Sequence, residues 1–117
     1  MTPVSEAGEP GQPFVSEAAV RATILVSMQD RARRHSLVVE LVLRAHRAHL
    51  AGATVFEGRE GFGESGRVHR THTLSDDAPV SVVIIDRRER IEQFLGDVAE
   101  LLEHVLVVLD DVDVVRI

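Results

Sequence analysis

The feature that most constrains the fold of this chain is the order in which two hydrophobic periods alternate along it. Residues 22–28 have the two-residue period of a strand. Apolar side chains at helical spacing follow between residues 38 and 48, with Ser36 placed to cap the helix and Gly52 beyond its last turn. The first half of the chain therefore predicts a strand followed by an amphipathic helix.

The second half repeats this order after one additional strand. Residues 53–57 are rich in β-forming side chains, and residues 80–85 form an apolar run behind Pro79. Asp86 and Glu89 have the spacing of a helix capping box. The helix that follows has an apolar stripe made of Ile91, Phe94, Leu95, Val98, Leu101 and Leu102. Residues 105–109 and 112–117 then predict one or two short strands.

The complete order is strand, helix, strand, strand, helix, strand, which is typical of the ferredoxin-like βαββαβ fold. We therefore expect an α+β sandwich with an antiparallel sheet and two helices on one face. Val83 and Ile85 point away from that face, and an exposed apolar sheet face is unfavourable in water. This predicts a homo-oligomer packed through its sheets, although strand ends and the amino-terminal tail are an alternative cover.

Residues 1–20 differ in composition from the rest of the chain. This segment contains three prolines, two glycines and three glutamates before Val20, and it has no basic residue. Such a composition buries too little apolar surface to offset the entropy of ordering. We expect residues 1–20 to be a disordered tail that can be deleted without loss of folding, and residues 21–117 to form one domain.

Composition excludes several classes of function. The chain has no cysteine, so disulfides and thiolate metal sites are excluded. Its net charge is -6 and all 13 basic residues are arginine, spread along the chain, which argues against nucleic acid as a partner. No apolar run approaches the roughly 20 residues that span a bilayer, and the amino terminus lacks the pattern of a signal peptide. The sequence therefore predicts a cytoplasmic protein.

A polar segment with four glycines, residues 58–78, separates the two middle strands. It has neither the two-residue period of a strand nor the spacing of a helix. It contains a G-x-G-x-x-G motif at residues 61–66, but the residues after it lack the apolar stripe of the helix that a dinucleotide site requires. Loops of this length are usually functional or disordered, and glycines with neighbouring arginines suit a phosphate or carboxylate ligand. The candidate ligand-binding residues are Gly61, Phe62, Gly63, Gly66, Arg67, His69 and Arg70.

Catalysis and metal binding are the alternatives to a regulatory function. No nucleophile, base and acid can be placed together from spacing alone, so we expect the protein not to be an enzyme. Six histidines leave a metal-binding or metal-tolerance protein on the same fold as the alternative. His46 and His49 would share a helix face, while His69 and His72 lie in the polar loop, and a site needs three or four convergent ligands.

Short motifs run from the end of the first predicted helix to the end of the chain. They are Ala51-Gly52-Ala53-Thr54-Val55, Gly58, Glu60-Gly61-Phe62-Gly63, His69, Leu74-Ser75, Pro79, Ile85-Asp86, Ile91, Phe94-Leu95 and Val112. The set resembles the PII-like proteins of domain-of-unknown-function family 190. Two departures are Arg34-His35-Ser36-Leu37, where members usually have a Gly-x-Pro-Leu-like entry to the first helix, and His104-Val105, where members tend to have a glycine. In addition, residues 101–106 do not resemble the glycine and lysine phosphate cradle of nucleotide-binding PII proteins, and the chain has no lysine.

The resemblance implies a PII-like regulatory or signalling protein with a ferredoxin-like subunit. It implies a homotrimer whose sheets turn inward and a long flexible loop that contacts a partner. Relatives are often encoded beside fluoride-export channels, so the implied partner is a membrane transporter or channel. A small anionic ligand or nucleotide between subunits is the implied effector.

Overall fold

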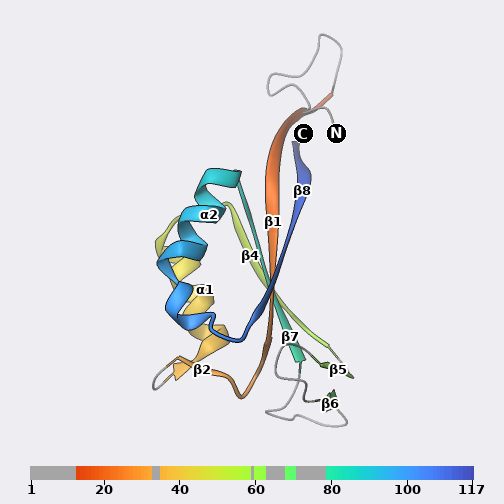
Figure 1. Cartoon of the computed structure of the whole chain (residues 1–117). Helices are drawn as coiled ribbons and strands as arrows, with labels where there is room; N and C mark the ends of the chain where they lie inside the picture. The colour runs from red at the N-terminus through yellow and green to blue at the C-terminus, as the bar shows by residue number, and fades with distance from the viewer. Residues whose placement is uncertain (1–12, 33–34, 59, 63–67, 71–78) are drawn as a thin grey trace.

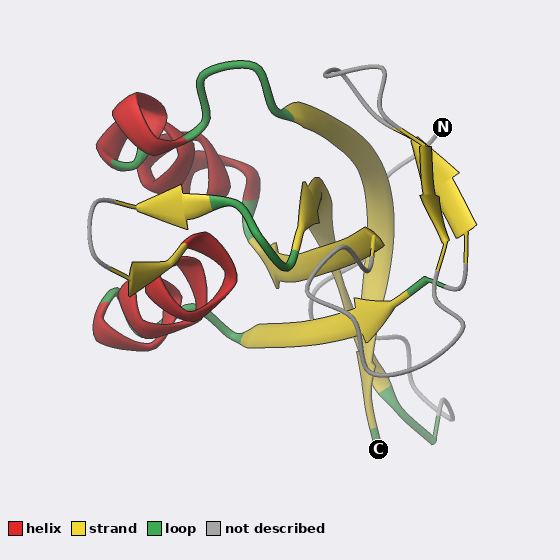
Figure 2. Ribbon diagram, turned by 90° about the horizontal axis from the view of Figure 1, so that it is seen from below, coloured by secondary structure: helices red, strands yellow, loops and turns green. Residues whose placement is uncertain are grey.

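A four-stranded antiparallel sheet with both helices on one face forms the body of the molecule (Figures 1 and 2). The structure is a computed structural model that describes residues 13–32, 35–58, 60–62, 68–70 and 79–117. The sheet contains β1 (Val15–Ser27), β4 (Gly52–Glu57), β7 (Pro79–Asp86) and β8 (Leu106–Arg116) in the order β4-β7-β1-β8. All three neighbouring pairs are antiparallel. The predicted ferredoxin-like fold is confirmed.

The helices connect strands that are not neighbours in the sheet. α1 (Leu37–Arg47) leads from the small hairpin of β2 (Arg31–Ala32) and β3 (His35–Ser36) toward β4. α2 (Arg88–Asp97) and the short 3-10 helix η1 (Ala99–Leu101) lead from β7 to β8. β5 (Glu60–Phe62) and β6 (Val68–Arg70) form a separate two-stranded ladder between β4 and β7.

The core lies between the helices and one face of the sheet. Ile24, Val82 and Ile84 alternate along β1 and β7, and each is 0% exposed. Leu41 of α1 and Ile91 of α2 are also fully buried against them. The two-residue and helical periods read from the sequence therefore mark the sides of the strands and helices that face each other.

The first strand is longer than its apolar period predicted. β1 begins at Val15, so residues 15–20 of the predicted tail form a strand that pairs with the last six residues of β8. Val20 is 1% exposed and belongs to the core. The boundary placed after Val20 is therefore wrong, because strand pairing supplies the order that local composition does not. Residues 1–12 lie outside the described residues.

The last strand and the starts of the two helices differ in part from the prediction. The two apolar segments after residue 104 form one continuous strand, β8. Ser36 precedes α1 as expected, but its hydroxyl makes no capping hydrogen bond and is buried without a partner among the described residues. The capping box at Asp86 is wrong, because Arg87 takes the N-cap position of α2 and makes no side-chain capping hydrogen bond. The carboxylate of Asp86 instead accepts from the backbone N–H groups of Arg87 and Ala51.

The opposite face of the sheet carries no helix. Three rows of side chains cross it: Phe56, Ser81, Leu25 and Leu106; then Thr54, Val83, Thr23 and Val108; then Gly52, Ile85, Arg21 and Asp110. We call these twelve residues the helix-free face. Within the described ranges, no helix is long and apolar enough to cross a membrane.

Candidate functional site

The predicted ligand-binding residues lie in the segment that joins β4 to β7. Its base is closed by the backbone N–H of Gly58, which donates to the carbonyl of Pro79 at 2.6 Å. A Cβ atom at position 58 would lie 3.0 Å from Cγ of Pro79, so this close approach favours glycine. β5 and β6 of this segment lie at the end of the sheet drawn at the bottom of Figure 1.

Part of this segment forms a β-hairpin, which the sequence analysis missed. Glu60 pairs with Arg70, Gly61 with His69, and Phe62 with Val68. The prediction of a loop without any period is therefore wrong at these six positions. Phe62 and Val68 are strong β-formers and were the available signal.

The hairpin brings together four of the seven predicted site residues. Gly61, Phe62, His69 and Arg70 lie on the two paired strands. Gly63, Gly66 and Arg67 lie outside the described residues. The described residues that follow the G-x-G-x-x-G motif in the chain form β6 and not a helix, whereas a dinucleotide fingerprint opens a helix.

Large apolar side chains are exposed on the helix-free face. Phe56 is 57% exposed, Val108 51% and Leu106 40%, and they come from both edge strands of the sheet. Val83 and Leu25 lie between them and are half-buried. Because these side chains are contiguous across four strands, the face is an apolar patch rather than a scatter of single residues.

One ion pair stands on this apolar face. Nε and Nη2 of Arg21 donate to the two carboxylate oxygens of Asp110 at 3.2 and 2.7 Å. The residues are directly opposite each other on β1 and β8. The hydrogen bond and the charge of Asp110 raise the pKa of Arg21 above its usual value. The pair fixes a charged, two-pronged contact at one end of the helix-free face.

Asp86 joins three elements at the same end of the sheet, one register position beyond the Ile85–Arg21 pair. One of its carboxylate oxygens accepts from the backbone N–H of Arg87 at 2.7 Å. The other accepts from the backbone N–H of Ala51 at 2.9 Å and from Nε of Arg90 at 3.1 Å. Burial alone would raise the pKa of Asp86, but these hydrogen bonds outweigh it and lower the pKa below its usual value.

Arg90 extends the same network to the end of α1. Its Nη2 group donates to the carbonyl oxygens of Ala48 and His49 at 2.7 and 3.0 Å. A cation at these carbonyls satisfies the unpaired acceptors of a helix carboxyl terminus. The network holds the start of β4 and the start of α2 against the end of α1. The sequence did not predict this network for Asp86, because Ala51 is distant from it in the chain.

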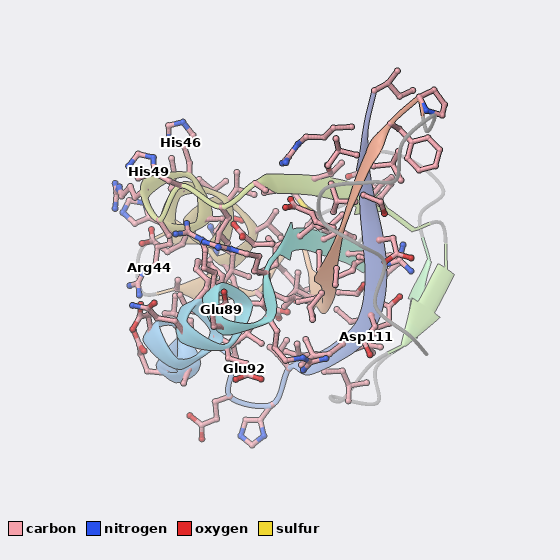
Figure 3. The ribbon with its side chains drawn as sticks, turned by 90° about the horizontal axis from the view of Figure 1, so that it is seen from above. Arg44, His46, His49, Glu89, Glu92 and Asp111 are labelled. Atoms are coloured by element: carbon pink, nitrogen blue, oxygen red, sulfur yellow. The ribbon has the colours of Figure 1, made fainter. Side chains whose placement is uncertain are left out.

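The metal alternative finds no cluster in the described part of the chain. No group of three or more histidine, aspartate or glutamate side chains there could hold an ion. His46 and His49 both lie near the carboxyl end of α1 and point outward (Figure 3). His69 lies on β6, and His72 is outside the described residues.

Comparison with known proteins places this architecture among PII-like proteins. The model of the family DUF190, described as "Uncharacterized ACR", matches residues 19–114. A UPF0166 protein of Aquifex aeolicus is 36% identical over 77 residues, covering 64% of this chain and 72% of that protein.

Two solved structures share the fold at low sequence identity. CPII, a nitrogen regulatory PII-like protein from Thiomonas intermedia K12 solved with ADP, AMP and bicarbonate, is 18% identical with a TM-score of 0.67. The alignment covers 86% of this chain and 92% of CPII. A putative PII-like signalling protein from Thermus thermophilus is 15% identical with a TM-score of 0.59, covering 87% and 92% of the two chains.

Proposed function

Because this chain belongs to the DUF190 family and has a PII-like fold, we propose that it is a regulatory protein that acts as a homotrimer. The three helix-free faces turn inward and the helices outward. The segment of residues 58–78 then projects from each subunit toward a partner. The protein regulates that partner rather than catalysing a reaction.

The observation that carries this proposal is the apolar helix-free face. Burying apolar surface contributes about 25 cal/mol per Å², so a patch spread over four strands stabilises an assembly by several kcal/mol when neighbouring copies cover it. Phe56 and Val108 each expose half or more of their surface in the single chain. Three copies are what the PII-like resemblance implies, and a closed ring leaves no copy with an uncovered face.

We propose that the segment of residues 58–78 contacts both the ligand and the partner. CPII was solved with adenine nucleotides and bicarbonate, and a small anionic ligand or nucleotide between subunits is the corresponding effector here. Arg67 and Arg70 supply the cationic contacts, and Gly61, Phe62, Gly63, Gly66 and His69 complete the site. Ligand and partner act on the same segment, so binding of one biases the other. A membrane transporter or channel is the proposed partner.

The experiment that tests the assembly compares two aspartate substitutions at valines of equal exposure. Val108 on the helix-free face and Val39 on the outer side of α1 are both 51% exposed. Val108→Asp places an unpaired charge in the proposed interface, which costs several kcal/mol there. Val39→Asp adds the same charge where the protein faces water.

Light scattering coupled to gel filtration measures the outcome. At micromolar concentration we expect the wild type and Val39→Asp to have the mass of three chains. We expect Val108→Asp to have the mass of one chain. A wild-type mass of one chain would contradict the proposal, and so would a Val108→Asp protein that remains trimeric. A thermal-shift screen with ADP, AMP and bicarbonate then tests the effector, since a ligand of the folded state raises its melting temperature.

A further inference from the structure

A hollow of about 350 Å³ lies at the end of the sheet away from the β5–β6 hairpin. Four segments line it: β1, β8, the turn after α1, and the junction of β7 with α2. The charged residues that line it are Glu17, Arg116, Asp86, Arg87 and Arg90. We call it the Asp86 hollow. Its volume is at the lower end of the range for small-molecule sites.

The Asp86 hollow has an excess of positive charge in a chain whose net charge is negative. Three arginines face two carboxylates. Glu17 is paired with Nη1 of Arg116 at 3.0 Å, and Asp86 with Nε of Arg90 at 3.1 Å. Arg87 is left with Glu89 at 3.6 Å, and both of these side chains are more than half exposed. Such a loose surface pair contributes little, so the charge of Arg87 is open to another anion.

Arg90 is held in place by the same bonds that organise the fold. Its Nε and Nη2 groups donate to Asp86, Ala48 and His49. Its Nη1 group makes no hydrogen bond within the described part of the chain. A guanidinium fixed on one edge and open on the other loses little entropy on binding a ligand.

We propose that the Asp86 hollow binds a small soluble molecule through a phosphate or diphosphate group. Arg87 and Arg90 contact the phosphate oxygens, because the planar guanidinium fork matches their geometry. Arg116 closes the opposite wall, with Glu17 as its counter-ion and as an acceptor for ligand hydroxyl groups. This site does not depend on the proposed trimer or on β5 and β6, which lie at the other end of the sheet (Figure 1).

Titration of the ¹⁵N-labelled protein with inorganic pyrophosphate tests the proposal residue by residue. We expect saturable shifts of the backbone amides of Ala51, Arg87 and Arg90 at submillimolar concentration. Arg87→Gln should raise the dissociation constant from these shifts about tenfold or more, equivalent to the ~1.4 kcal/mol of a charge-assisted hydrogen bond. Arg116→Gln should weaken binding as well.

Arg47→Gln is the matched control, because Arg47 is exposed on α1, does not line the hollow and has no ion pair among the described residues. It removes the same charge and should leave the dissociation constant unchanged. Three results would overturn the proposal: no saturable shift at Ala51, Arg87 and Arg90, shifts confined to residues 58–78, or an equal loss in the control. If Arg87→Gln fails to fold, the shifts of the wild type and the dissociation constant of Arg116→Gln still test whether the hollow binds pyrophosphate.

Discussion

Two histidines adopt a backbone conformation that favours glycine. His49 has a φ of 57° and His104 a φ of 64°. His49 follows the last turn of α1, where the N–H of Leu50 donates to the carbonyl of Ala45 at 3.2 Å, as in a glycine-capped helix end. His104 lies two residues before β8, in a conformation that glycine adopts without strain.

Replacement of Asp86 should lower stability, because its carboxylate joins three elements. Asp86→Asn keeps the shape but removes the charge and one of the two acceptor oxygens, leaving either the Ala51 or the Arg87 N–H poorly paired. We expect a loss of about 2 kcal/mol in the free energy of unfolding at pH 7, typical of a bond to a charged group. Asp97→Asn, at an exposed carboxylate of α2, is the control and should change stability by less than about 0.5 kcal/mol.

The pH dependence of this difference follows from the lowered pKa of Asp86. A carboxylate with a lower pKa in the folded state stabilises that state fully above its unfolded pKa of about 3.9, and the contribution is lost as the pH falls through the folded value. The difference in the free energy of unfolding between wild type and Asp86→Asn should therefore be constant near neutral pH and should shrink below about pH 4. Urea denaturation at one protein concentration measures it, and a gap that widens in acid would contradict this assignment.

At the scale of elements, the beginning of β1 is the part that local sequence describes least well. Residues 15–20 have no regular apolar alternation, yet they pair with residues 111–116 of β8. Ser16, Ala19 and Val20 are each less than 8% exposed. The order of this segment therefore comes from its partner strand, which lies more than 90 residues later in the chain.

Two truncations separate the tail from the strand. Deleting residues 1–14 leaves β1 intact and should change the melting temperature by no more than a degree or two. Deleting residues 1–20 removes six ladder positions and the buried Val20, which alone accounts for about 1.5 to 3 kcal/mol. We expect the longer truncation to melt more than about 5 °C below the shorter one, measured by circular dichroism. Equal melting temperatures would mean that this part of β1 adds no stability.

At the scale of the whole molecule, the ion pair on the helix-free face becomes important if copies pack there. Arg21 and Asp110 are each about half exposed in the single chain, and the proposed trimer would bury them. A buried pair contributes little net stability, whereas one partner left alone is costly. The pair would then fix the register of the subunits rather than strengthen their association.

A double-mutant cycle tests this role. Arg21→Met alone should weaken assembly strongly, because Asp110 is left without its partner. Adding Asp110→Leu should restore the trimer to wild-type strength or better, since two apolar side chains replace two charges. Sedimentation equilibrium gives the dissociation constants. Equal assembly of the single and double variants would place the pair in water outside the interface, without affecting whether a trimer forms.

The sequence by itself determined the order of elements and the two-sided character of the sheet. Ile24, Val82, Ile84 and Ile91 follow the periods of strand and helix, and these periods depend only on local backbone geometry. Val83 and Ile85 marked the helix-free face in advance for the same reason. The position of the segment of residues 58–78 between two strands was also predicted, although its hairpin was not.

The tertiary structure alone decided what depends on residues that are distant in the chain. Asp86 accepts from Ala51, which is 35 residues earlier, and Arg21 reaches Asp110 across 89 residues. The start of β1 and the Asp86 hollow likewise require β8 to return beside the first strand. No local period records such pairings, because they arise when packing of the two helices on one sheet face brings the ends of the strands together.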